Sequence, residues 1–174
     1  MKRIGLISDT HNYLDPQVFK YFESCDEIWH LGDIGAIAIA DELAKFKPLR
    51  AVYGNIDDSK VRSVYPEYLF FELEGVKILM QHIVGTVGTY TTKMQKLIQK
   101  YTPDLLICGH SHLLIVKSIP KYNLLHINPG AAGVHGWHKM RTIMRFTLAQ
   151  GKVKDMEVVE LGLRGDLSQG PELY

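Results

Sequence analysis

The sequence predicts an α/β fold in which two packed, mixed β-sheets carry helices on their outer faces. Short apolar runs rich in β-branched residues alternate with segments of helical period, which is the pattern of layered α/β domains. The first half alternates strand and helix patterns, whereas the second half contains paired strand patterns joined by short turns. A length of 174 residues suits one domain of ordinary size, which we place at residues 1–162.

Five apolar runs are predicted to form the central strands: residues 3–8, 27–31, 49–53, 76–81 and 105–108. Three helices are predicted in the gaps between these strands. Their apolar faces span residues 18–25, 37–44 and 94–101. The first of these helices is preceded by Asp15 and Pro16, which form a typical pair of N-cap and first-turn residues.

The remaining strand patterns are predicted to form three hairpins: residues 68–73 with 76–81, 113–119 with 124–127, and 142–148 with 152–161. The links of the first and third hairpins contain Gly75 and Gly151, as short turns between paired strands commonly do. Residues 163–174 are polar and contain glycine and proline, so we expect them to form a loose C-terminal tail.

Composition excludes several classes of function. Twenty basic residues against 19 acidic residues give a net charge of +1 with no basic run, so a long nucleic acid is not an expected partner. Cys25 and Cys108 are far apart and match no metal knuckle or redox pair, which favours two buried thiols in a reducing compartment. Asp9 interrupts the first apolar run too early for a signal peptide, and no apolar run is long enough to span a membrane. A cytoplasmic protein is therefore expected.

A metal-competent side chain follows each of the five central strands. Parallel strands deliver the groups that follow them to the carboxyl edge of a sheet, where open α/β sheets place their sites. Residues i and i+2 of an extended chain project to the same side, so the pairs within Asp-x-His and His-x-His can each aim two donors at one point. We therefore predict a metal site formed by Asp9, His11, Asp33, Asn55, His82, His110 and His112.

The donor set indicates both the kind of ion and the kind of substrate. Imidazole, carboxylate and one amide oxygen, with no thiolate, suit Mn²⁺, Fe or Zn²⁺ better than a structural cysteine site. Two divalent ions bring four positive charges, and Asp9 and Asp33 return only two negative ones. The remaining positive charge attracts phosphate oxygens. Gly32, Gly54 and Gly109 are expected to let the backbone turn sharply beside the ligands.

These motifs resemble those of the calcineurin-like metallophosphoesterases. The matching residues are Asp9-x-His11, Gly32-Asp33, Gly54-Asn55-x-Asp57, His82 and Gly109-His110-x-His112. Their order and spacing are similar to those of the small single-domain bacterial and archaeal phosphodiesterases, over about residues 1–160. The resemblance implies a four-layer αββα sandwich and a phosphoesterase activity, above all on diesters, toward a small phosphorylated substrate.

The resemblance also implies how the residues share two divalent ions. One ion would be held by Asp9, His11, Asp33 and His112. The other would be held by Asp33, Asn55, His82 and His110. A water bridging the ions would attack phosphorus, and Asp33, Asn55 and His110 are the residues expected to be catalytic. Mn²⁺ is the favoured ion, with Fe, Zn²⁺ and Ni²⁺ as alternatives, and a homo-oligomer is left open.

The sequence departs from the family pattern at two positions. Many members carry a histidine after the asparagine ligand, thought to protonate the leaving group, but Ile56 is at that position here. Assistance to the leaving group must then come from a metal-bound water or another histidine, and Asp57 loses its usual partner. The glycine that often follows the His82-type ligand is replaced by Ile83, and the loop at 85–88 is expected to shape the pocket and offer N–H groups to phosphate.

Four further histidines are interpreted separately from the ligand set. His30 lies within an apolar strand, where a hydrogen-bonded structural or supporting role is expected. His126, His135 and His138 are expected at surface or turn positions, and one of them is a candidate for the displaced general acid.

Two other functions compete with the enzyme interpretation. The eukaryotic retromer subunit has the same fold and works as a protein-binding scaffold after losing key ligands, whereas the ligand set here is whole. A nuclease like the larger DNA-repair members would need a cap domain and a basic channel, and neither is visible in this nearly neutral sequence.

Overall fold

The computed structural model describes residues 1–165, which form two five-stranded sheets. The first sheet has the order β10-β9-β1-β2-β3, with β1 at Lys2–Ile7, β2 at Glu27–His30, β3 at Leu49–Ala51, β9 at Met140–Ala149 and β10 at Lys152–Leu163. The second has the order β4-β5-β6-β8-β7, with β4 at Tyr68–Leu73, β5 at Val76–Gln81, β6 at Leu105–Ile107, β7 at Leu114–Ile119 and β8 at Leu124–Pro129. Both sheets mix parallel and antiparallel pairs, as predicted.

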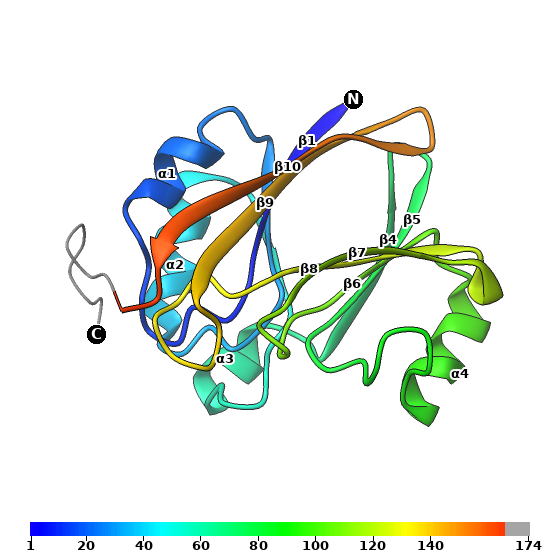
Figure 1. Ribbon diagram of the computed structural model, residues 1–174, viewed down its shortest axis with the longest axis horizontal. Coiled ribbons are helices and arrows are strands. Elements are labelled where there is room, and N and C mark those ends of the chain that lie inside the picture. The colour runs from blue at the N-terminus through cyan, green and yellow to red at the C-terminus, as the bar shows by residue number, and fades with distance from the viewer. Residues whose placement is uncertain (166–174) are drawn as a thin grey trace.

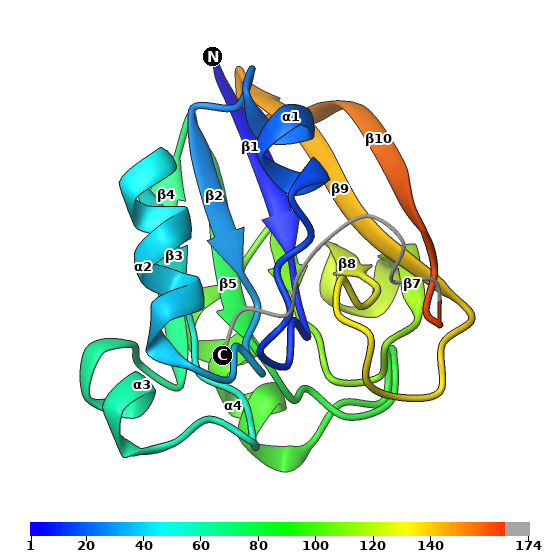
Figure 2. The same cartoon turned by 90° about the vertical axis from the view of Figure 1, so that its left-hand side faces the viewer.

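Helices cover the outer face of each sheet, and this gives the α/β sandwich that the sequence predicts. Figure 1 shows α1 (Gln17–Phe22) and α2 (Ile37–Phe46) beside the first sheet and α4 (Thr92–Tyr101) beside the second. The short helix α3 (Ser59–Val64) lies at the end toward which β1 and β2 point (Figure 2). A 3-10 turn at Pro120–Tyr122 links β7 to β8.

Within residues 1–165, the buried apolar side chains form three clusters, one at each contact between layers. The middle cluster fills the space between the two sheets, where the Trp29 ring contacts the edges of Phe71 and Phe146 at centroid distances of 5.2 and 5.8 Å. A second cluster joins α1 and α2 to the first sheet, and a third joins α4 to the second sheet. Burial on both faces explains why the central strands are nearly continuous apolar runs. No helix in the described region combines the length and the apolar character needed to cross a bilayer.

Several element boundaries differ from the prediction. The strand expected at 49–53 ends at Ala51, because the chain leaves the sheet and the Tyr53 amide donates to the Pro66 carbonyl. The first helix ends at Phe22 rather than at Cys25, whose amide closes a tight turn onto the Phe22 carbonyl. Its N-cap position is held by Pro16, not by Asp15 as predicted, although an Asp15 carboxylate oxygen still accepts the Gln17 N–H at 2.9 Å.

The three predicted hairpins are confirmed by the pairs β4–β5, β7–β8 and β9–β10. Leu163, the first residue of the predicted tail, is still part of β10, and residues 166–174 lie outside the described residues. Both cysteines are buried free thiols, as expected. Burial raises the pKa of Cys25 to about 11 and that of Cys108 to about 12, so neither is a reactive thiolate.

A surface or turn position was predicted for His126, and this prediction is wrong. His126 is buried inside β8, on the face that packs against α4. The hydroxyl of Tyr90 lies 2.9 Å from its Nδ1, and the Cys108 sulfur lies 3.4 Å from its Nε2. The alternation of β8 explains the error: Leu125 and Ile127 face the other sheet, so the residue between them faces the α4 layer. Burial lowers the pKa of His126 to about 4.

Because His126 is buried and its pKa is lowered, we expect the free energy of unfolding to fall in mild acid. The unfolded chain binds a proton near pH 6.5, whereas folded His126 resists protonation until about pH 4, so stability is full above pH 6.5 and falls as the pH drops toward 4. We expect His126 to contribute a loss on the order of 2 kcal/mol between pH 7 and pH 5. Urea unfolding with a chelator present measures it, and His126→Gln should make the dependence shallower. An equally steep dependence in the variant would contradict the assignment.

Candidate metal centre

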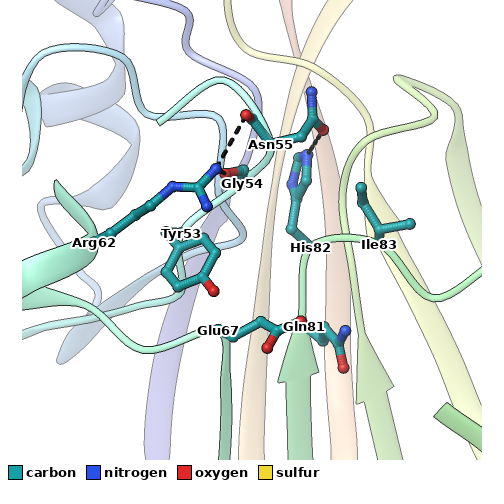
Figure 3. A pocket seen from close by; sticks show the side chains of 8 residues that line it. All are labelled: Tyr53, Gly54, Asn55, Arg62, Glu67, Gln81, His82 and Ile83. Carbon is teal, nitrogen blue, oxygen red and sulfur yellow. Dashed lines mark hydrogen bonds between the residues drawn. The ribbon is translucent and has the colours of Figure 1, made fainter. Parts of the chain in front are cut away.

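The structure brings all seven predicted ligand residues together where β1, β2, β3, β5 and β6 end. Two groups of possible ligand atoms form, each within 4.8 Å: one contains Asp9, His11 and His112, and the other contains Asp33, His82 and His110. Asn55 joins the second group, because its Oδ1 lies 3.2 Å from Nε2 of His82 (Figure 3). The expected convergence at the carboxyl edge is therefore observed.

Asp33 contacts both groups. Its Oδ2 lies 3.5 Å from Nε2 of His11 in the first group, and its Oδ1 lies 3.2 Å from Nε2 of His82 in the second. The Ile56 amide donates to the same Oδ1 at 3.0 Å and so orients the carboxylate. Asp33 is thus the side chain that connects the two groups.

Two buried atoms of the first group make no hydrogen bond within the described chain: Oδ1 of Asp9 and Nε2 of His11. The other Asp9 oxygen accepts from Ser8 Oγ at 2.6 Å and from the His110 amide at 3.1 Å. A buried polar atom without a partner costs about 1–3 kcal/mol. A cation between these atoms would satisfy both, so the residues present fit a metal.

The backbone at the site is strained. Five of the seven residues adopt left-handed φ angles: Asp9 at 54°, His11 at 46°, Asp33 at 52°, His110 at 67° and His112 at 57°. Each such conformation of a residue other than glycine costs on the order of 1 kcal/mol, and such strain clusters at functional sites. The strain is maintained by backbone hydrogen bonds between the strand-end loops, such as the His11 amide to the Asp33 carbonyl at 3.0 Å.

The surroundings favour the neutral form of two histidines of the site and the charged form of a third. Burial lowers the pKa values of His11 and His110, and this outweighs the attraction of the nearby carboxylates. Burial would also lower the pKa of His82, but its hydrogen bond to Asp33 and the charge of Asp9 raise it above its usual value in the metal-free protein. A cation would compete with that proton for Nε2. The Leu31 carbonyl accepts from His82 Nδ1 at 2.7 Å, so Nε2 is the nitrogen left for a ligand.

Two buried residues outside the ligand set, Asp57 and His30, support the ligand loops. Asp57 is buried, and its two oxygens accept the amides of Gly35 at 2.8 Å and Gly54 at 2.7 Å, so it ties the loops after β2 and β3 together. His30 accepts the Gly32 amide on Nδ1 at 3.2 Å and donates from Nε2 to Thr10 at 3.0 Å. Burial lowers the pKa of His30 to about 4, which agrees with the structural role expected for it.

Only one of the three glycines expected to turn sharply does so. Gly32 has a φ of +95°, whereas Gly54 and Gly109 have no left-handed φ and are needed for close approach instead. A Cβ on Gly54 would lie 2.0 Å from Oδ1 and 2.2 Å from the amide nitrogen of Asp33. No side chain fits between the loops at this point.

Gly54→Ala should therefore displace Asp33 and reduce metal uptake. Loss of supporting contacts to a metal ligand typically costs about 10–100-fold in metal affinity, and a direct clash with the ligand should cost at least as much. The measurement is Mn²⁺ binding by calorimetry. Gly165→Ala is the control, because its Cβ would meet nothing within 4 Å. Equal metal affinity in both variants would show that the loops can separate without harm.

Two cavities open beside the centre. One of about 230 Å³ is lined by Asn55 and His82 at one end and by Tyr53, Arg62, Glu67, Gln81 and Ile83 (Figure 3). Arg62 stacks over the Tyr53 ring at 4.6 Å and donates to the Asn55 carbonyl at 3.2 Å, so it fixes the loop that carries Asn55. The other cavity, of about 410 Å³, lies beside His110 and includes the loop 85–87. Sequence patterns missed Arg62 because no motif contains it.

The loop at 85–88 lines a cavity but does not offer a helix start to phosphate. The amides of Thr89 and Tyr90 donate to the Thr86 carbonyl, and the Thr91 amide donates to the Val84 carbonyl. The helix α4 begins only at Thr92, and the Thr91 side chain caps it by accepting the Met94 amide at 3.2 Å. The helix start predicted as part of a phosphate cradle is therefore not at this loop, whereas the contact of phosphate with the N–H groups of residues 85–88 stays a prediction.

Two of the remaining histidines lie at the rim of the first group. The exposed His135 ring lies 5.1 Å from the His11 ring, measured between centroids. His138 is partly buried, and its Nδ1 lies 3.2 Å from Nδ1 of His112. Both lie in the loop after β8, which agrees with the surface or turn position predicted for them. The contact of His138 with His112 was not predicted, because 26 residues separate the two in the chain.

Comparison with known proteins identifies the family. The model of the calcineurin-like phosphoesterase superfamily domain matches residues 1–151. A probable metallophosphoesterase of Methanothermobacter thermautotrophicus is 30% identical over 136 residues, which cover 75% of this chain and 77% of the relative. The chain therefore belongs to the calcineurin-like phosphoesterase superfamily.

Solved structures show the same fold. An archaeal phosphodiesterase aligns over 91% of this chain and 99% of its own, with a TM-score of 0.73 and 21% identity. Vps29 of Entamoeba histolytica complexed with Zn²⁺ aligns over 92% of this chain and 98% of its own, with a TM-score of 0.65 and 20% identity. At these identities the likeness concerns the architecture, which both an enzyme and a sorting protein can use.

Proposed function

We propose that this protein is a dinuclear metal-dependent phosphoesterase that acts on phosphodiesters of small molecules. The observation that carries the proposal is the meeting of two ligand groups at Asp33, one oxygen of which faces each group. The first ion would be held by Asp9, His11, Asp33 and His112. The second would be held by Asp33, Asn55, His82 and His110.

The donor chemistry favours Mn²⁺, with Fe, Zn²⁺ and Ni²⁺ as alternatives, because the ligands are imidazoles, carboxylates and an amide. When bound, two divalent ions supply Lewis-acid polarisation of the phosphoryl group and lower the pKa of a water nucleophile. The two carboxylates of the centre offset only half of the charge of two such ions. The site is then cationic, and it attracts the oxygens of a phosphate ester.

The chain's own residues position the reacting groups. Asn55, held by Arg62, and His82, held by the Leu31 carbonyl, form the end wall of the smaller cavity. We propose that an ester group of the substrate enters this cavity while its phosphate lies at the ligand groups. A cavity of about 230 Å³ suits a small organic group rather than a folded polymer. The family comparison supports a phosphorylated substrate of this kind.

Turnover of a phosphodiester in the presence of Mn²⁺ tests the proposal. Purified protein loaded with Mn²⁺ should hydrolyse bis(p-nitrophenyl) phosphate, and a chelator should abolish the activity. The competing scaffold function predicts no turnover with any metal. The intact ligand set favours the enzyme, because a pure scaffold has no need to maintain five left-handed residues in one cluster.

The side chain of Ile56 predicts a preference for good leaving groups. Ile56 is 45% exposed and offers no proton, so aryl diesters should be cut faster than alkyl monoesters.

His135, beside His11, is the histidine best placed to supply the missing proton. We expect His135→Ala to slow alkyl esters by about 100-fold or more and to change p-nitrophenyl esters little. Steady-state rates with both ester types measure this, and an equal loss for both would exclude His135 as the acid.

A further inference from the structure

Behind the first ligand group, two imidazole rings meet almost at right angles. The rings of His112 and His138 are 5.1 Å apart at an angle of 75°, and their Nδ1 atoms lie 3.2 Å from each other. The other nitrogen of His138, Nε2, lies 2.9 Å from the Gly133 carbonyl oxygen. The far nitrogen of His112, Nε2, lies 3.2 Å from Oδ1 of Asp9.

The direction of each hydrogen bond follows from the carbonyl. A carbonyl oxygen can only accept, so Nε2 of His138 carries the proton that it donates to Gly133. In a neutral imidazole the other nitrogen is then an acceptor, so Nδ1 of His138 accepts from Nδ1–H of His112. His112 therefore presents a lone pair at Nε2, the atom that faces Asp9.

These contacts form a closed ring, here called the circuit, that connects the backbone of Asp9 to its own carboxylate. The Gly133 amide donates to the Asp9 carbonyl at 3.1 Å, Gly133 accepts from His138, His138 accepts from His112, and His112 faces the Asp9 carboxylate. Glycine at position 136 lets the loop close around the pair, since a Cβ there would lie 2.2 Å from Nδ1 of His112. The circuit fixes His112 relative to Asp9, and both belong to the same ligand group.

We propose that His138 is a positioning residue that holds His112 in the tautomer and orientation needed to bind the ion of the first group. This inference rests on the proposed metal function. It distinguishes the two ions, because His82 of the second group is held by a backbone carbonyl, whereas His112 is held by a side chain. A substitution at position 138 that removes the contact with His112 should therefore lower the affinity for the ion of the first group and leave the affinity for the other ion unchanged.

Two substitutions separate the two hydrogen bonds of His138. In His138→Asn, the amide oxygen falls near the former Nδ1 and still accepts from His112, while the contact with Gly133 is lost. In His138→Gln, the amide nitrogen falls near the former Nε2 and still reaches Gly133, while no acceptor faces His112. If the contact with His112 is what matters, asparagine preserves metal binding and glutamine does not.

The expected result is selective loss of one metal site. Calorimetric titration with Mn²⁺ should show two sites in the wild type and in His138→Asn, and about a 10–100-fold weaker first site with an unchanged second site in His138→Gln. Nitrogen NMR of the Zn²⁺-loaded protein should show protonation of His112 at Nδ1 in the wild type and in the asparagine variant. Trp137→Ala is the control for the loop, since Trp137 is 100% exposed.

Each alternative result has its own meaning. If the glutamine variant binds two ions as tightly as the wild type, or if the asparagine variant loses the first site as fully as glutamine does, the positioning role of His138 is refuted and the proposed function stands. If the wild type itself binds no ion or only one, the dinuclear function is refuted. Thermal unfolding of all variants identifies any loss of metal binding that comes from misfolding. If only the glutamine variant misfolds, the asparagine variant still tests the positioning role, because it is expected to keep both metal sites.

Discussion

Asp33→Asn is expected to lower the affinity for both ions and the phosphodiesterase rate by more than about 100-fold. Asp33 faces both ligand groups at once, at 3.5 Å from His11 and 3.2 Å from His82. Loss of an outer partner of a metal ligand already costs about 10–100-fold, so the loss of a shared ligand should cost more. The substitution keeps the size of the side chain and its acceptor for the Ile56 amide, but it removes the negative charge and one of the two oxygens that face the ligand groups.

Asp58→Asn provides the matched control for this experiment. Asp58 is exposed and caps α3 by accepting the amides of Lys60 and Val61, and asparagine caps a helix about as well as aspartate. Elemental analysis and turnover of both variants should show a loss in Asp33→Asn alone. Full metal content and rate in Asp33→Asn would place the centre elsewhere in the protein.

Asp15→Ala is expected to lower the free energy of unfolding by about 3–5 kcal/mol. Asp15 and Arg141 form a buried ion pair at 2.6 Å, and Arg141 also donates to the Leu161 carbonyl at 3.0 Å. The pair links the start of α1 to β9 and β10. Removal of one partner of a buried pair leaves the other charge without this compensation in a region of low dielectric constant, which is the costly case.

An exposed pair on the same sheet provides the contrast. Glu157 pairs with Arg3 and Arg145, and its side chain is 44% exposed, so Glu157→Ala should cost no more than about 1 kcal/mol. Urea denaturation measures both variants. At this chain length the Asp15 variant should also melt roughly 10 °C lower. A cost of less than 1 kcal/mol for Asp15→Ala would show that the ion pair contributes little to the fold.

The features that sequence patterns predicted are those encoded in local periodicity. The central strands are buried on both faces, so they are continuous apolar runs that need no knowledge of their neighbours. The hairpins carry their own turn residues, as Gly75 and Gly151 show. The convergence of the seven candidate ligand residues was also predictable, because each follows a strand and parallel strands share one carboxyl edge.

The features that were missed depend on contacts between distant segments. The helix α3 buries only Val61, so it has no apolar stripe, and it is stabilised by its Asp58 cap. His138 contacts His112 only because the loop after β8 folds back over the end of β1, where the Gly133 amide bonds to Asp9. Gly54 and Asp57 act through the separation of two loops, which no spacing within either loop reveals.

Anomalous X-ray diffraction from crystals grown with Mn²⁺ tests the central claim most directly. We predict two peaks about 3.5–4 Å apart, the distance typical of paired catalytic ions. One should lie among Asp9, His11 and His112, the other among Asp33, His82 and His110, with Asp33 touching both. A single peak, or peaks bound by other residues, would contradict a dinuclear centre at the end of these strands.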